Sequence, residues 1–179
     1  MEIYTMKKWL CAILALMLLL SACAVLAEGA EDGEDAYTLD FVTMDLDGNV
    51  VTSAEIYAGN RITMINFWAT WCPPCVGELA ELVEVHSQLQ EVGCGVVGIL
   101  MDSNDPKGVE AAKKLMAQNG TNYPVLALSE DLYGLAQVIS AIPTTVFVDG
   151  NGTLVGTPIV GALVEQYVPT VKSLLESAT

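Results

Sequence analysis

Short apolar runs alternate with amphipathic stretches along most of this chain. The runs at 63–68, 95–101 and 144–148 are apolar and rich in β-branched residues, which predicts buried strands. Between them, the segment 75–91 carries apolar residues at helical spacing, with charged residues interleaved. A second helix is expected at 105–118, where Asp105 and Pro106 form its start and Asn119-Gly120 ends it. Strands that alternate with helices in this order predict an α/β fold with a mixed central sheet flanked by helices.

Two hairpins complete the predicted sheet elements. The first joins 39–44 to 50–52 through a Gly-containing turn, and the second joins 144–148 to 154–159 across 149–152. We also expect a short strand at 123–128, a short helix at 131–138 and a final helix within 163–177. Pro169 falls inside that last pattern, where a proline either starts the main helix or kinks it.

The N-terminus has the pattern of a targeting segment. Lys7 and Lys8 precede an uninterrupted apolar run at 9–20, and Leu20-Ser21-Ala22-Cys23 resembles the lipobox of bacterial lipoproteins. Cys23 would then carry the lipid. Two alternatives stay open: a secretory signal cut after Ala27, or an uncleaved anchor over 9–27, which has the length to span a bilayer. All three place the rest of the chain outside the cytoplasm.

The segment that follows is strongly acidic. Residues 28–35 hold five acids, two Gly and no large apolar residue, so they predict a flexible, self-repelling tether. We therefore expect a lipoprotein-type signal peptide at 1–22, an acidic tether at 23–37 and one folded domain at 38–179. The net charge of −15 makes nucleic acid an improbable partner, because phosphate contacts need a basic face.

The candidate chemistry lies at 71–75, which reads Trp-Cys-Pro-Pro-Cys. Two thiols with two residues between them can form and reopen a small disulfide, and they stand where a strand passes into a helix N-terminus. The partial positive charge there favours a thiolate on Cys72. A permanent disulfide is one alternative. A zinc site is another, but structural zinc takes four ligands and only His86 and Cys94 are left to help.

Two motifs together resemble one family. Asn66-Phe67-Trp68-Ala69-Thr70-Trp71-Cys72-Pro73-Pro74-Cys75, with Ile142-Pro143-Thr144-Thr145-Val146-Phe147-Val148-Asp149 and Gly152, is similar to the TlpA/ResA-type branch of the thioredoxin superfamily. The resemblance covers roughly residues 38 to 177. It implies a thioredoxin-like fold with an N-terminal β-hairpin and a helix–strand insertion between about 102 and 128. It also implies an extracytoplasmic thiol–disulfide oxidoreductase.

The resemblance assigns roles to the site residues. Cys72 would be the attacking thiol and Cys75 the resolving thiol, and Glu78, one helical turn further on, would relay the proton. The alternative for Glu78 is a solvated helix carboxylate. Asn66 stands where cytoplasmic thioredoxins carry a buried Asp, and a neutral amide cannot accept a proton from Cys75.

The substrate side of the site follows from the same resemblance. Pro143 matches the family's cis-proline, whose loop faces the cysteine pair, and Ile142 would offer its main chain to an extended substrate. Trp71 is expected to line the site, while Trp68 fits either the site or the core. His86 and Cys94 are expected to be packed residues, and no cofactor or metal motif is present.

The expected function is a membrane-tethered reductase of oxidised cysteines in exported proteins. Pro74 has no N–H to donate to the Cys72 sulfur, so we expect a less acidic thiol and a reducing dithiol. Apocytochrome c thiols and a methionine sulfoxide reductase are candidate substrates, and a membrane thiol–disulfide carrier is the candidate electron donor. The alternatives are a disulfide-forming thiol oxidase and a redox-inert binding module. Ala69 and Ile65 replace the Thr and Pro of the peroxiredoxin pattern, which disfavours a peroxidase.

Overall fold

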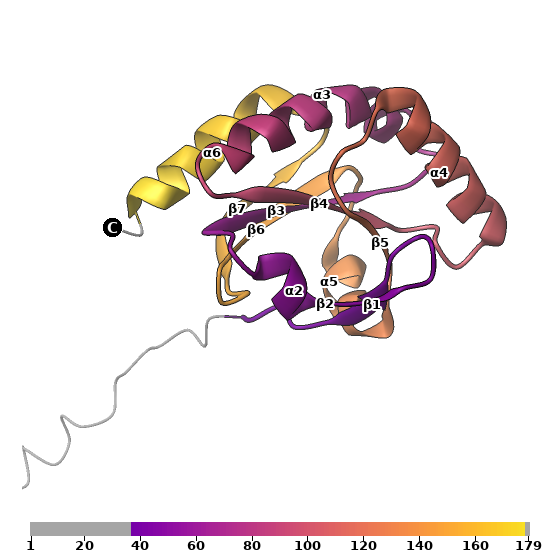
Figure 1. Ribbon diagram of the computed structural model, residues 1–179, viewed down its shortest axis with the longest axis horizontal. Helices are drawn as coiled ribbons and strands as arrows, with labels where there is room; N and C mark the ends of the chain where they lie inside the picture. The colour runs from indigo at the N-terminus through magenta and orange to yellow at the C-terminus, as the bar shows by residue number, and fades with distance from the viewer. Residues whose placement is uncertain (1–36, 178–179) are drawn as a thin grey trace, which may run out of the picture. The chain divides into compact units, whose positions relative to one another are not determined.

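A computed structural model describes residues 37–177 of the chain. Cys23, the predicted signal peptide and nearly all of the predicted tether lie outside the described residues. The described part is an α/β fold (Figure 1) whose elements, in chain order, are β1 (Val42–Met44), β2 (Val50–Thr52), α2 (Ser53–Tyr57), β3 (Ile62–Trp68), α3 (Pro73–Gln90), β4 (Gly95–Leu100), α4 (Pro106–Asn119), β5 (Val125–Ala127), α5 (Glu130–Val138), β6 (Thr144–Asp149), β7 (Leu154–Val160) and α6 (Val164–Ser177).

The central sheet has the strand order β5-β4-β3-β6-β7. The pairs β3–β4 and β4–β5 are parallel, whereas β6 runs antiparallel to both β3 and β7. The mixed sheet expected from the sequence is therefore confirmed. All seven residues of β3 are buried, because this middle strand has a paired neighbour on each side and packed elements on each face.

Figure 1 shows α3, α4 and α6 over one face of the sheet, with α2, α5 and the β1–β2 hairpin at the other face. Successive side chains of a strand point to opposite faces, so β3 contributes to two cores. Met64 and Trp68 pack under α3 and α6, whereas Ile65 and Phe67 pack against the hairpin side. This alternation places Asn66 on the α3 side, with consequences for the site.

The inserted helix α4 has the ends that its sequence predicts. The Asp105 side chain accepts a hydrogen bond from the Lys107 N–H, and Pro106 occupies the first turn, where its missing N–H has no partner to lose. Gly120 closes the helix in the left-handed conformation at φ 67°, which costs a glycine little. Together with β5, α4 forms the expected helix–strand insertion after β4.

One helix was not expected from the sequence. Helix α2 directly follows β2 and is held by a capping box: Thr52 accepts from the Glu55 N–H, and the Glu55 carboxylate accepts from the Thr52 N–H. The Thr-x-x-Glu spacing was a readable signal for it. The alternative that Pro169 starts the last helix was wrong, because α6 begins at Val164 and continues through the proline.

Candidate functional site

The cysteine pair lies at the N-terminus of α3. Cys72 is the residue that caps this helix, and it forms a disulfide with Cys75, with sulfurs 2.04 Å apart. Pro73 opens the helix, a position where a proline loses no hydrogen bond. The Cys75 N–H lies 3.3 Å from the Cys72 sulfur and is its backbone donor, since Pro73 and Pro74 have none.

Exposure decreases steeply along this turn. The Trp71 side chain is 68% exposed, Cys72 is 4% exposed and Cys75 is 0% exposed. A partner molecule therefore reaches Trp71 first and then Cys72, the one cysteine of the pair with an exposed fraction. Cys75 is reached only through the disulfide or by movement of the site.

The loop before β6 lies against the Cys72 sulfur. The Ile142–Pro143 peptide bond is cis, as expected from the family resemblance. The Ile142 carbonyl oxygen is 3.6 Å from the Cys72 sulfur, which is a van der Waals contact in the disulfide because that sulfur carries no proton. On its far side the loop is held by the Gly161 N–H, which donates to the Pro143 carbonyl at 2.8 Å.

Beneath the cysteines, Glu78 is buried, so the alternative of a solvated helix carboxylate is wrong. Its side chain is 2% exposed, and its two oxygens accept hydrogen bonds from Asn66 Nδ2 at 2.8 Å and from the Tyr167 hydroxyl at 2.9 Å. Burial raises the Glu78 pKa to about 7; the two donors oppose that rise, and the Glu81 charge adds to it. Glu78 is thus poised to exchange a proton near neutral pH.

Asn66 connects this carboxyl to the middle of the sheet. Its amide also donates to Thr145 Oγ1 on β6 at 3.1 Å, so one side chain bridges two strands and a helix. The Asn66 amide is neutral and cannot accept a proton from Cys75, and here it donates a hydrogen bond to Glu78. Glu78 is accordingly the acidic group of this buried cluster.

A second support lies on the other side of the cysteine turn. The Asp102 carboxylate accepts from both the Thr70 N–H and the Thr70 hydroxyl, and the Met101 N–H donates to the Trp68 carbonyl. The start of the insertion therefore fixes the turn that carries Trp71. No local sequence pattern indicates this pair, because Thr70 and Asp102 stand on different connections of the fold.

Trp68, His86 and Cys94 are all buried, as packed residues are. Trp68 is buried in the core and does not face solvent at the site. His86 is buried and accepts a hydrogen bond from the Val96 N–H at 3.2 Å, and Cys94 is buried as a free thiol, as expected.

No metal site is found in the described part of the chain. Within residues 37–177 no cluster of His, Cys, Asp or Glu could hold a metal ion. The same range contains no helix with the length and apolar character to cross a membrane.

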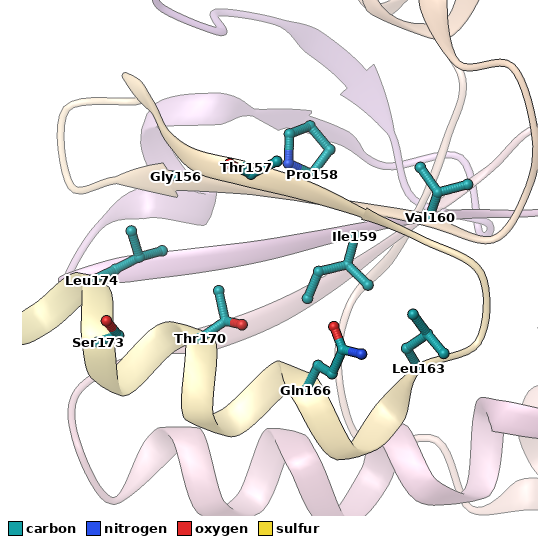
Figure 2. Close-up of a pocket in the computed structure, with 10 residues that line it drawn as sticks. All are labelled: Gly156, Thr157, Pro158, Ile159, Val160, Leu163, Gln166, Thr170, Ser173 and Leu174. Carbon is teal, nitrogen blue, oxygen red and sulfur yellow. The ribbon is translucent and has the colours of Figure 1, made fainter.

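A groove of about 500 Å³ runs between the edge strand β7 and α6 (Figure 2). Its wall residues are Gly156, Thr157, Pro158, Ile159, Val160, Leu163, Gln166, Thr170, Ser173 and Leu174. Val160 and Leu163, at one end, flank the Gly161 that holds the Pro143 loop. The groove lies beside the loop and does not contain the disulfide.

The α/β fold and its cysteine pair define a thiol–disulfide oxidoreductase with a thioredoxin-like structure. More particularly, the chain belongs to the AhpC/TSA family, whose sequence model matches residues 34–157. The thiol–disulfide oxidoreductase ResA of Halalkalibacterium halodurans is 26% identical over 82% of this chain and 78% of ResA. The thiol:disulfide interchange protein DsbE homologue of Paracoccus denitrificans is 32% identical over 61% of this chain, which spans 56% of that protein.

Solved structures agree with this assignment. The crystal structure of a thioredoxin-family thiol:disulfide interchange protein from Chlorobium tepidum superposes with a TM-score of 0.63 at 29% identity. The match covers 76% of this chain and 93% of that one. The resemblance to TlpA/ResA-type oxidoreductases is therefore confirmed at the level of sequence and of fold.

Proposed function

We propose that this protein is an extracytoplasmic protein-disulfide reductase that passes two electrons from Cys72 and Cys75 to oxidised cysteines of exported proteins. The observation that carries the proposal is the arrangement at the α3 N-terminus. There the Cys72 sulfur contacts the Ile142 carbonyl of the cis-proline loop, and Glu78 is buried one turn below Cys75. These are the parts that a two-step exchange needs.

In the first step, the Cys72 thiolate of the reduced pair attacks one sulfur of a substrate disulfide. The bond between the two substrate sulfurs breaks, a Cys72–substrate disulfide forms, and the other substrate sulfur leaves as a thiolate that takes a proton. Cys72 is suited to the attack because it keeps a small exposed fraction, whereas Cys75 has none, and because it lies at the positive end of the α3 dipole.

In the second step, Cys75 attacks the Cys72 sulfur and releases the second substrate sulfur as a thiolate. Cys75 must first lose its proton, and water has no direct access to a fully buried thiol. Glu78 is the candidate acceptor, because it follows Cys75 by one helical turn and its pKa of about 7 keeps part of it ionised at neutral pH. The pair ends as the disulfide, and the substrate holds two thiols.

Substrate contact is assigned to Trp71, Ile142 and Pro143. The exposed Trp71 ring offers apolar area beside Cys72, and Ile142 has a carbonyl beside the reactive sulfur. An extended substrate strand could pair its main chain with this loop and thereby bring its own sulfur toward Cys72. Such recognition reads backbone shape, which suits an enzyme that acts on several unfolded or partly folded proteins.

The reducing direction is supported by the donors around the Cys72 sulfur. The Cys75 N–H is its one described backbone donor, because the two prolines between the cysteines contribute none. A thiolate with few donors is less stabilised, which makes the thiol less acidic and the dithiol a stronger reductant. The TlpA/ResA-type motifs suggest, by resemblance, apocytochrome c thiols or a methionine sulfoxide reductase as substrates.

Location and electron supply rest on the sequence alone. Cys23 as a lipid-bearing residue would hold the domain on the outer face of the cell membrane, with residues 23–37 as the tether. A membrane thiol–disulfide carrier would then return electrons to the Cys72–Cys75 disulfide. A secreted or periplasmic form remains the alternative for localisation.

The order of attack can be tested with cysteine variants and a peptide that contains one internal disulfide. A reduced Cys75→Ser variant should accumulate a mixed disulfide through Cys72, because nothing resolves it. A Cys72→Ser variant should form none, and Cys94→Ser, which removes a buried thiol elsewhere, should behave like the unmodified protein. Non-reducing electrophoresis with peptide mapping reads the adducts. Adducts on Cys75 in the Cys72→Ser variant would overturn the assigned roles.

A further inference from the structure

The last helix contributes a polar group to the buried cluster under the cysteines. Tyr167 of α6 is fully buried, and its hydroxyl donates to Glu78 Oε2 at 2.9 Å across a sequence separation of 89 residues. The neighbouring buried residues of this face, Val171 and Leu175, are apolar. A phenylalanine would fill the same space, so the hydroxyl group needs an explanation beyond packing.

We propose that Tyr167 is a positioning residue of the thiol site, whose hydroxyl holds the Glu78 carboxylate under Cys75 and ties it to the loop that carries Pro143. The proposal rests on the proposed function in one respect: it takes Glu78 as the group that serves Cys75. The contact between Tyr167 and Glu78 does not depend on that role.

The tie to the Pro143 loop runs through Gly161. The Gly161 carbonyl is 3.4 Å from the Tyr167 hydroxyl and is its second acceptor, while the Gly161 N–H donates to the Pro143 carbonyl at 2.8 Å. One hydroxyl thus stands between the candidate proton acceptor and the segment that would bind substrate. The Tyr167 side chain of α6 therefore contacts both the candidate acid and the segment that holds the cis-proline loop.

The Tyr167 hydroxyl has two acceptors, the Glu78 carboxylate and the Gly161 carbonyl, and the first of them changes charge when it titrates. When Glu78 is ionised, the hydroxyl donates to it and supports the negative charge. When Glu78 is protonated, the hydroxyl can turn to the Gly161 carbonyl and remain satisfied, so no buried donor is left without a partner. The helix can therefore stay packed in both states of the acid.

Several groups face Glu78, and the experiment must separate them. Asn66 on β3 and Tyr167 on α6 donate to it, and Glu81 on α3 lies near enough to raise its pKa. Burial raises the pKa of Tyr123, ahead of β5, and the Glu78 charge adds to that rise. Within residues 37–177, Tyr167 is the one group of these four that also hydrogen-bonds to Gly161.

The test is Tyr167→Phe in the full-length chain, with Tyr57→Phe as the matched control. Tyr57 is also buried, but its hydroxyl donates to the Leu39 carbonyl in the core on the other side of the sheet. Carbon NMR of the glutamate carboxyls, assigned with Glu78→Gln, follows the titration of Glu78 directly. Loss of a donor to the ionised form should raise the Glu78 pKa by about one pH unit in Tyr167→Phe and leave it unchanged in Tyr57→Phe.

A second measurement separates this inference from the proposed function. The pH midpoint for reduction of the Cys72–Cys75 disulfide by dithiothreitol should move upward in Tyr167→Phe, and a Glu78→Gln background should abolish that movement. An unchanged Glu78 titration in Tyr167→Phe overturns the positioning role. A shifted titration with an unmoved rate profile supports the positioning role and instead overturns Glu78 as the group that serves Cys75.

Discussion

Glu78 holds a carboxyl where ionisation is unfavourable. Its burial raises the pKa from 4.5 to about 7, although Asn66 and Tyr167 donate to the charged form. The unfolded chain therefore releases this proton at a lower pH than the folded chain. Between the unfolded-state and folded-state pKa values of Glu78, the folded chain binds a proton that the unfolded chain has released. The free energy of unfolding therefore decreases as the pH rises through that window and levels off above it.

Glu78→Gln should remove this pH dependence. Relative to the variant, the unmodified protein should lose about 3 kcal/mol of unfolding free energy between pH 4.5 and about pH 7, because its buried carboxyl ionises only at a cost. Urea denaturation at a series of pH values measures the difference. Glu84→Gln is the control, since it removes one carboxylate from an exposed position of the same helix. Parallel curves for Glu78→Gln and the unmodified protein would contradict the account.

At the scale of single residues, the sequence predicted those that belong to linear motifs. Cys72, Cys75 and Pro143 could be recognised because each stands in a short, distinctive segment, and Glu78 followed from helical spacing. Tyr167 was missed, because its significance lies in a contact with a residue 89 positions earlier. Periodicity can indicate that a tyrosine is buried, but it does not identify the acceptor of its hydroxyl group.

At the scale of elements, apolar runs located β3, β4, β5 and β6, and the Gly-containing turn at 149–152 located the edge strand β7. The long helices carry apolar faces that the sheet covers. The short helix α2 escaped because five residues are too few to show a period, so its capping box is the only local signal. Of the two alternatives for Pro169, the helix start is excluded, since tertiary packing of α6 outweighs one lost hydrogen bond.

The packing of α4 against Asp102, which binds the turn before the cysteines, gives a test of how elements support the site. Gly108 is buried in the first turn of α4, and an added Cβ would collide with the Asp102 carbonyl oxygen. Asp102 in turn binds Thr70, beside the cysteines. Gly108→Ala should cost about 1–3 kcal/mol of stability through overpacking and should slow reduction of the disulfide.

Gly134→Ala is the control for that substitution. Gly134 lies inside α5, and a Cβ there would meet nothing within 4 Å. Alanine should therefore stabilise the protein by about 0.5–1 kcal/mol through its higher helix propensity, with the reduction rate unchanged. Thermal or urea unfolding measures both variants. A Gly108→Ala protein as stable as Gly134→Ala would show that α4 does not press on Asp102.

For the whole molecule, the sheet topology brings four distant segments to one site. Parallel β3 and β4 end at the same edge, so the cysteine turn and Asp102 meet there, while antiparallel β6 begins beside them with Pro143. The final helix then packs on α3 and adds Tyr167. The fold class followed from the order of elements, but strand order and side-chain depth arise only from the three-dimensional packing.

The most direct test of the account is the reduction potential of the Cys72–Cys75 couple, measured by equilibration with glutathione or dithiothreitol. Quantifying the Cys72–Cys75 peptide by mass spectrometry keeps the other thiols of the full-length chain out of the result. A reductase predicts a value near about −270 mV, the potential of thioredoxin. A value near about −120 mV, typical of a strong thiol oxidant, would contradict the proposed direction of electron flow.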